Sequence, residues 1–133
     1  MNAPLRRRTK GTAVKYLLLI YTSETEDAKR ASDADAGAAV MAEYMTYTED
    51  LNKAGKMVAG EALQPTMTAT TVRIRDGKTQ TTDGPFAETK EQLGGFYLVE
   101  AKDLDEAISW GARIPGAKWG SIEVRPIIDF GTM

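Results

Sequence analysis

The sequence contains no cysteine and no histidine. Without cysteine the chain can form no disulfide, thiolate nucleophile or cysteine-based metal site, and a reducing compartment such as the cytoplasm fits this composition. Without histidine it lacks the usual general base and the most common metal ligand of proteins. Acid–base chemistry would have to come from Asp, Glu, Lys, Tyr or a cofactor. We predict no bound cofactor and no metal site, since a structural zinc site needs cysteine or histidine; carboxylates alone could hold only Mg²⁺ or Ca²⁺.

Long hydrophobic runs are also missing. The apolar run over residues 16–21 is far too short to span a membrane. It follows basic residues, as the apolar core of a signal peptide does, but three acidic residues come after it and no small-residue cleavage site does. We therefore expect a protein that is neither exported nor bound to a membrane.

Acidic residues outnumber basic ones, 19 to 17, and the basic ones are unevenly placed. Residues 1–14 contain Arg6, Arg7, Arg8 and Lys10 and no acid. We predict a flexible basic leader over residues 1–13, followed by one acidic domain over residues 14–130. An acidic body does not favour direct nucleic-acid binding, although the leader could also contact RNA, DNA or an acidic partner.

Hydrophobic periodicity and turn residues divide the chain into strands and two helices. The strands are expected over residues 14–22, 56–63, 69–75, 78–82, 96–99 and 121–127, and the helices over residues 38–54 and from 103 to about 114. The polar residues 23–37 are predicted to form a loop with room for one helical turn. Asp33 or Asp35 can cap the first helix and Gly55 can end it. Asp76-Gly77 predicts a two-residue type I′ hairpin turn.

This order of elements predicts an α+β fold, a ferredoxin-like sandwich with an inserted β-hairpin. The first strand and the strand after the hairpin, which are apolar along their whole length, should form the central pair. The helices of such a sandwich cover one face of the sheet, yet both central strands are apolar on both faces. We therefore predict a homodimer in which two sheets pack face to face as a dimeric α/β barrel.

Three sets of residues are expected to share a face. The first helix would bury Met41, Tyr44, Met45, Thr48 and Leu51, and the second would bury Leu104, Ala107, Ile108 and Gly111. The strand after the first helix would place Met57, Ala59, Glu61 and Leu63 on one side. Gly94-Gly95 leaves room for a bulge or a close backbone approach, and Pro126 indicates an edge strand.

The loop Asp83-Gly84-Pro85-Phe86 is the main candidate for a site. Asp83 is either a turn residue whose carboxylate caps backbone N–H groups or a catalytic base at the mouth of a cleft. Arg73 could bind an anionic ligand through its guanidinium fork, or belong to a solvated face of the hairpin. Glu61 ends a strand in water or points into a cavity. Tyr21, Phe86 and Arg125 complete the predicted ligand-binding set.

The chain resembles the YCII-related family, in the branch named for its Asp-Gly-Pro-Phe motif. The resemblance rests on residues 15–21, 60–63, 69–73, 82–97 and 120–127, and it is closest around Asp83-Gly84-Pro85-Phe86. It implies a dimeric α/β barrel. Some members pair a histidine with an aspartate in a cleft; Asp83 matches that aspartate, but this chain has no histidine, so the reaction proposed for that pair does not carry over. Similar domains also occur beside extracytoplasmic-function sigma factors.

Three functions remain open from the sequence. The first is a module that binds a small organic ligand, such as an anion, with regulation in a sigma-factor context as one role for it. The second is an isomerase- or lyase-type enzyme with Asp83 as general base, Arg73 orienting an anionic group and Tyr21 donating a proton. The third is a protein-interaction partner of a sigma factor. The sequence identifies neither the ligand nor a reaction.

Overall fold

The computed structural model describes residues 13–131, so the predicted basic leader lies almost entirely outside the described residues. The elements follow one another as β1 (Val14–Thr22), α1 (Glu24–Ser32), α2 (Ala34–Lys53), β2 (Met57–Ala62), β3 (Thr70–Arg75), β4 (Lys78–Asp83), β5 (Gln92–Ala101), α3 (Leu104–Ala112) and β6 (Ser121–Pro126). Two 3₁₀ helices, η1 (Thr66–Thr68) and η2 (Pro115–Lys118), lie between them. None of the helices described is both long and apolar enough to cross a membrane.

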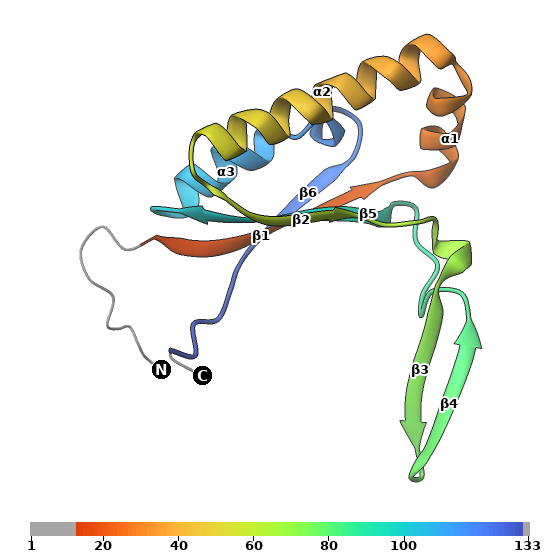
Figure 1. The fold of residues 1–133 in the computed structure, drawn as a ribbon. Coiled ribbons are helices and arrows are strands. Elements are labelled where there is room, and N and C mark those ends of the chain that lie inside the picture. Colours follow the sequence, from red (N-terminus) through yellow and green to blue (C-terminus); the bar gives the residue numbers. More distant parts are fainter. Residues whose placement is uncertain (1–12, 132–133) are drawn as a thin grey trace.

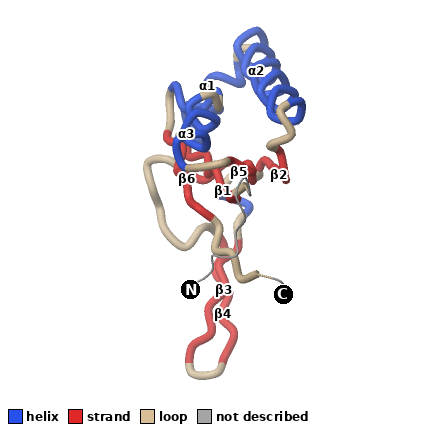
Figure 2. The backbone as a smooth tube through the Cα atoms, turned by 90° about the vertical axis from the view of Figure 1, so that its left-hand side faces the viewer, coloured by secondary structure: helices blue, strands red, loops and turns tan. Residues whose placement is uncertain are grey.

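The main sheet is antiparallel, with the strand order β2-β5-β1-β6. The predicted central pair, β1 and β5, is confirmed, and Pro126 lies on an edge strand as expected. The helices α2 and α3, together with η2, cover one face of this sheet, whereas α1 stands at its end (Figures 1 and 2). The fold is therefore the predicted ferredoxin-like α+β arrangement with a hairpin inserted between β2 and β5.

The core lies between this sheet and the helices. Alternate side chains of the central strands point into it, among them Leu18 and Val99, which are fully buried. From α2, Leu51 is fully buried and Tyr47 packs edge-on against Tyr97, with 5.0 Å between the ring centroids. Because side chains alternate along a strand, the remaining side chains of each central strand point to the opposite face of the sheet.

The prediction of a loop over residues 23–37 is wrong, because this segment is helical. Ser23 caps α1 by accepting a hydrogen bond from the Glu26 N–H, and Asp33 caps α2 by accepting bonds from Asp35 and Ala36. The α1 helix buries no residue, so it has no apolar stripe for a periodicity argument to detect. Its caps, with acids in the first turn and bases in the last, favour the helix instead.

The predicted helix stripes are partly wrong. Met41 and Met45 are 63% and 64% exposed, and Tyr47, which the stripe omitted, is buried. Met41 is exposed because the N-terminal half of α2 rises away from the sheet (Figure 1). Met45 lies in the C-terminal half, but the face of that half which packs on the core is formed by Tyr44, Tyr47 and Leu51. In α3 the buried residues are Ala107 and Gly111, whereas Leu104 and Ile108 are about half exposed.

Two irregularities set which residues face outward. A register shift between Met57 and Ala59 places Met57 against the core, while Ala59 and Glu61 share the opposite face; the predicted common face of β2 is therefore wrong. A second shift, at Gly94, is the predicted bulge in β5. A bulge adds one residue to a strand, so every later side chain changes face.

The hairpin β3–β4 forms a sheet of its own and projects from the side of the main sheet without helices (Figure 1). Its turn has positive φ at Asp76 (52°) and Gly77 (74°), which confirms the predicted type I′ geometry. Arg73 lies opposite Gln80, also as predicted.

The start of α3 gives a first testable prediction. The Glu106 carboxylate accepts a hydrogen bond from the Lys102 N–H at 2.7 Å and pairs with Lys56, and the backbone bond is the main cause that lowers the pKa of Glu106. A lowered pKa in the folded state means that this stabilisation is present near neutral pH and is lost as the pH falls through that pKa. We expect Glu106→Gln to cost about 1 kcal/mol at neutral pH and much less near pH 3.

Urea denaturation at the two pH values measures this difference. The matched control is Asp105→Asn, an exposed acid in the same helical turn, which should change the free energy of unfolding little at either pH. An equal loss for Glu106→Gln at both pH values would contradict the assigned role of the carboxylate.

Candidate functional site

The face of the main sheet without helices, called the open face below, is apolar in the middle. Its residues follow from the strand registers in three rows: Ala59, Leu98, Leu17 and Arg125; Glu61, Phe96, Leu19 and Glu123; and Leu93, Tyr21 and Ser121. The six large side chains on β1 and β5 are half-buried in the protomer (Leu17, Leu19, Tyr21, Leu93, Phe96, Leu98). No described helix covers them (Figure 2).

Charged residues line the two edges of this apolar surface. On β2, Glu61 is exposed beside Phe96. On β6, both Nε and Nη2 of Arg125 donate to one carboxylate oxygen of Glu123, and this hydrogen bond raises the pKa of Arg125. Tyr21, Glu61 and Arg125, three of the predicted ligand-binding residues, therefore lie on one face, although Glu61 and Arg125 are on opposite edge strands.

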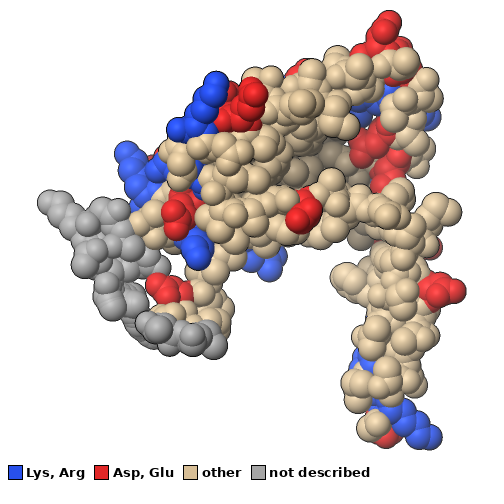
Figure 3. Space-filling view, in the orientation of Figure 1, with Lys and Arg blue, Asp and Glu red and all other residues tan. Residues whose placement is uncertain are grey.

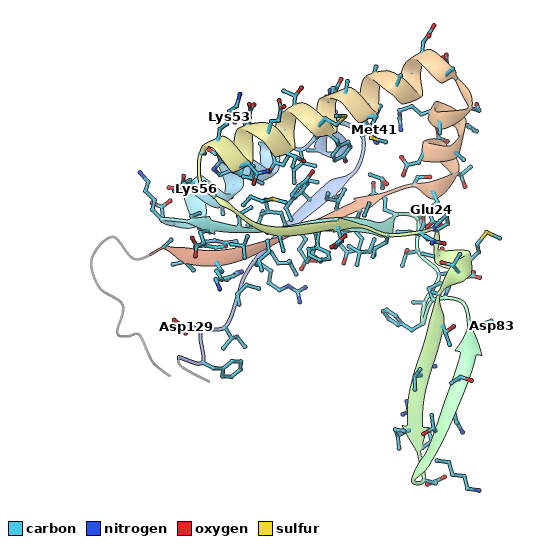
Figure 4. All side chains as sticks on the ribbon, in the orientation of Figure 1. Glu24, Met41, Lys53, Lys56, Asp83 and Asp129 are labelled. Atoms are coloured by element: carbon cyan, nitrogen blue, oxygen red, sulfur yellow. The ribbon has the colours of Figure 1, made fainter. Side chains whose placement is uncertain are left out.

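The other predicted site residues belong to the hairpin and the loop after it. Asp83 ends β4 opposite Thr70 and is exposed at the base of the hairpin (Figure 4). Gly84 adopts φ +97°, a conformation that glycine takes at little cost, and its N–H donates to the Ala69 carbonyl at 2.7 Å. Phe86 is 80% exposed. The hairpin base is thus a rigid turn that presents both a carboxylate and an aromatic ring to solvent.

The loop that begins with Asp83 forms one wall of a groove of about 990 Å³. Its opposite wall is α1, and η1 forms its end; the lining residues are Glu24, Thr25, Ala28, Lys29, Ser32, Pro65, Thr66, Met67, Pro85, Ala87, Glu88, Thr89 and Gln92. The groove combines methyl groups and proline rings with hydroxyl, carboxylate and ammonium groups. That mixture suits a small organic molecule with polar substituents.

Glu24 holds the walls of this groove together (Figure 4). Its carboxylate accepts hydrogen bonds from the N–H and the hydroxyl of Thr66, at 2.7 and 2.8 Å, and its own N–H donates to the Gln92 side chain at 2.8 Å. Glu24 was not among the predicted site residues, because residues 23–37 were predicted to form a loop. The signal available was Ser23 followed three residues later by Glu26, which is typical of a helix start.

A second hollow, of about 460 Å³, lies between α2 and the segment 112–118. It is crossed by two ion pairs, Asp50 with Arg113 and Glu43 with Lys118. Tyr47 donates to the Trp110 carbonyl at 2.9 Å, and burial raises the pKa of this phenol. These contacts fasten helices to each other, so we assign this region a structural role. Within residues 13–131, no group of three or more acidic side chains is arranged to hold a metal ion.

The antiparallel sheet, the helices on one face and the groove beside an Asp-Gly-Pro-Phe loop define an α+β protein of the ferredoxin-like class. A family model described as the YCII-related domain matches residues 14–131. The protein called Uncharacterized protein R00369, from Rhizobium meliloti (strain 1021), is 39% identical over 114 residues, which are 84% of this chain and 90% of that protein. The chain therefore belongs to the YCII-related domain family.

Proposed function

We propose that this protein is a homodimeric module that binds a small organic ligand in the groove between α1 and the loop after Asp83. The observation that carries this proposal is the groove itself, with its mixed polar and apolar lining. Asp83 lies two residues before Pro85, a lining residue, and Phe86 lies between Pro85 and Ala87, which also lines the groove, so both are placed to contact a ligand at the rim. Binding at loops held by a rigid sheet is common in small domains.

The homodimer is supported by the open face. Six large side chains, all apolar except for the hydroxyl group of Tyr21, form a contiguous surface there, and a second copy of the same surface is chemically matched to it. Packing of two such faces also supports the dimeric α/β barrel that the resemblance implies. We further propose a cytoplasmic location, in line with the absence of cysteine.

Binding is favoured over catalysis by the surroundings of Asp83. A carboxylate acts as a base near neutral pH when burial disfavours its charge, and Asp83 is exposed in the protomer. In the isomerase- or lyase-type alternative, the bound ligand would have to shield the Asp83 carboxylate from water. Nothing in the described residues supports a regulatory role beside a sigma factor.

Thermal-shift screening against a library of small metabolites that carry hydroxyl or ammonium groups beside a carboxylate or phosphate, followed by turnover assays on the hits, tests this function, because the Asp83 carboxylate can accept hydrogen bonds only from donor groups of the ligand. For a ligand found in this way, we expect Asp83→Asn to weaken binding about tenfold or more, because a hydrogen bond to a charged group contributes about 1.5–3 kcal/mol. Isothermal calorimetry measures the dissociation constant.

The matched control is Asp76→Asn, the same change at the far end of the same hairpin. Asparagine tolerates the positive φ found at Asp76, so folding and ligand binding should both be retained. Equal binding by wild type and Asp83→Asn would remove Asp83 from the site. A folded dimer that yields no hit would favour a protein partner instead.

A further inference from the structure

The hairpin β3–β4, called the arm below, is an element without a packing surface of its own. Every residue of its two strands is exposed except Thr71, which is half-buried. Val72 and Ile74 lie on one face of the arm and are 60% and 58% exposed. A two-stranded hairpin by itself is at best marginally stable in water. An arm of this kind is stabilised when another chain packs against it.

The opposite face of the arm is cationic. Arg73 and Arg75 lie there, with Lys78 paired to Arg75 across the strands. Among the described residues, the Arg73 side chain has no hydrogen-bond or ion-pair partner, although its backbone pairs with Gln80 in the hairpin. Figure 3 shows the basic side chains gathered at the tip of the arm. The charge of this face is therefore available to another surface.

The body of the protein has the complementary charge. Outside the arm, the described residues include ten basic and seventeen acidic side chains. Around α1 the acids outnumber the bases by five to two: Glu24, Glu26, Asp27, Asp33 and Asp35 against Lys29 and Arg30. The lining of the groove includes Glu24 and Glu88 but only one basic residue, Lys29. A basic side chain from another chain would neutralise the excess negative charge at the rim of the groove.

The reach of the arm fits a crossing between subunits. Six residues per strand extend about 20 Å, packed sheets lie about 10 Å apart, and a helix is about 10 Å thick. In a face-to-face dimer the arm is thus long enough to pass the partner's sheet and to reach its layer of helices. The arm and α1 lie at the same end of the molecule (Figure 1). Consider a two-fold axis that lies between the two sheets and leaves the ends that carry the arm and α1 on the same side of the dimer. Such an axis brings each arm beside the other subunit's α1.

We propose that in the homodimer each arm crosses to the second subunit and places Arg73 at the rim of that subunit's groove, against its acidic α1. The groove would then be completed by two chains, and its ligand would be a small organic anion bound by the guanidinium fork of Arg73. This inference rests on the proposed homodimer and specifies which chain supplies which part of the site.

Photo-crosslinking tests the crossing without a ligand. p-Benzoylphenylalanine replaces Gln80 in one variant and Thr82 in another, because both lie on the cationic face, opposite Arg73 and Thr71. A third variant carries it at Met41, exposed on α2 (Figure 4), as the control. Mixed dimers of ¹⁴N- and ¹⁵N-labelled chains are irradiated, digested and analysed by mass spectrometry, after light scattering has shown whether the mass is twice 14.5 kDa.

We expect mixed-isotope crosslinks from position 80 or 82 to residues 24–35 of the other chain, and none from position 41 to that segment. A dimer whose arm crosslinks stay within one chain, reach the partner's residues 126–131 instead, or do not form at either position would overturn the arm placement and leave the proposed dimer standing. A monomer by light scattering would overturn both.

Discussion

Replacing Leu19 by aspartate is expected to convert the proposed homodimer into a monomer. Leu19 lies on a central strand in the middle row of the open face, next to Phe96. The change removes about 1.5–3 kcal/mol of apolar burial per subunit and adds the cost of desolvating a carboxylate on each side of the interface. We expect the dimer dissociation constant to rise at least about 1,000-fold. Sedimentation velocity over a concentration series measures it.

The folded protomer should tolerate this substitution, because Leu19 points away from the core formed with the helices and is only half-buried. Circular dichroism at low protein concentration checks that the fold is retained. Met41→Asp is the matched control, an apolar-to-acid change at a side chain that is 63% exposed on the other side of the molecule. A Leu19→Asp protein that dimerises as tightly as the wild type would show that the open face is not the interface.

Replacing Gly120 by alanine is expected to lower the free energy of unfolding by about 3 kcal/mol, or the melting temperature by roughly 10 °C. A Cβ atom at this position would lie 2.2 Å from the Tyr21 carbonyl oxygen and 2.7 Å from the Thr22 methyl group. The first of these atoms belongs to the backbone and cannot rotate away, so β1 and the segment before β6 must move apart. Because Tyr21 lies on the open face, association of the proposed dimer should weaken as well.

Thermal and urea denaturation measure the loss in stability. Gly94→Ala is the matched control, since the nearest atoms to a Cβ there are 4.0 Å away, and it should be clearly milder. If Gly120→Ala and Gly94→Ala unfold at the same temperature, the close approach of Gly120 to the backbone of β1 does not matter for stability.

Much of the fold was predictable because its signals are local. The apolar run of β1, the type I′ turn at Asp76-Gly77 and the start of α3 at Asp103, whose side chain accepts a hydrogen bond from the Glu106 N–H, each depend on residues within a few positions of one another. The central pairing of β1 and β5 followed from their continuous apolar character. The α1 helix was missed because it buries nothing, and the faces of β2 were misassigned because the bulge at its start gives no clear signal in the sequence.

The candidate site was less predictable. The six residues named in advance fall into two groups, with Tyr21, Glu61 and Arg125 on the open face and Arg73, Asp83 and Phe86 on the hairpin and its loop. Sequence spacing cannot show that a projecting arm separates them. The groove also depends on Glu24, which reaches Thr66 across 42 positions of the chain, and a contact of that range has no local pattern.

The sequence by itself determined the class of fold, the central strands, the hairpin turn and the exclusion of cysteine and histidine chemistry, since these depend on composition, alternation and turn preference. Only the tertiary structure decided which strand residues face outward, where a groove opens and that the hairpin stands away from its own body. The physical reason is that bulges, helix tilt and long-range hydrogen bonds arise from packing, where small local differences change which side chains meet.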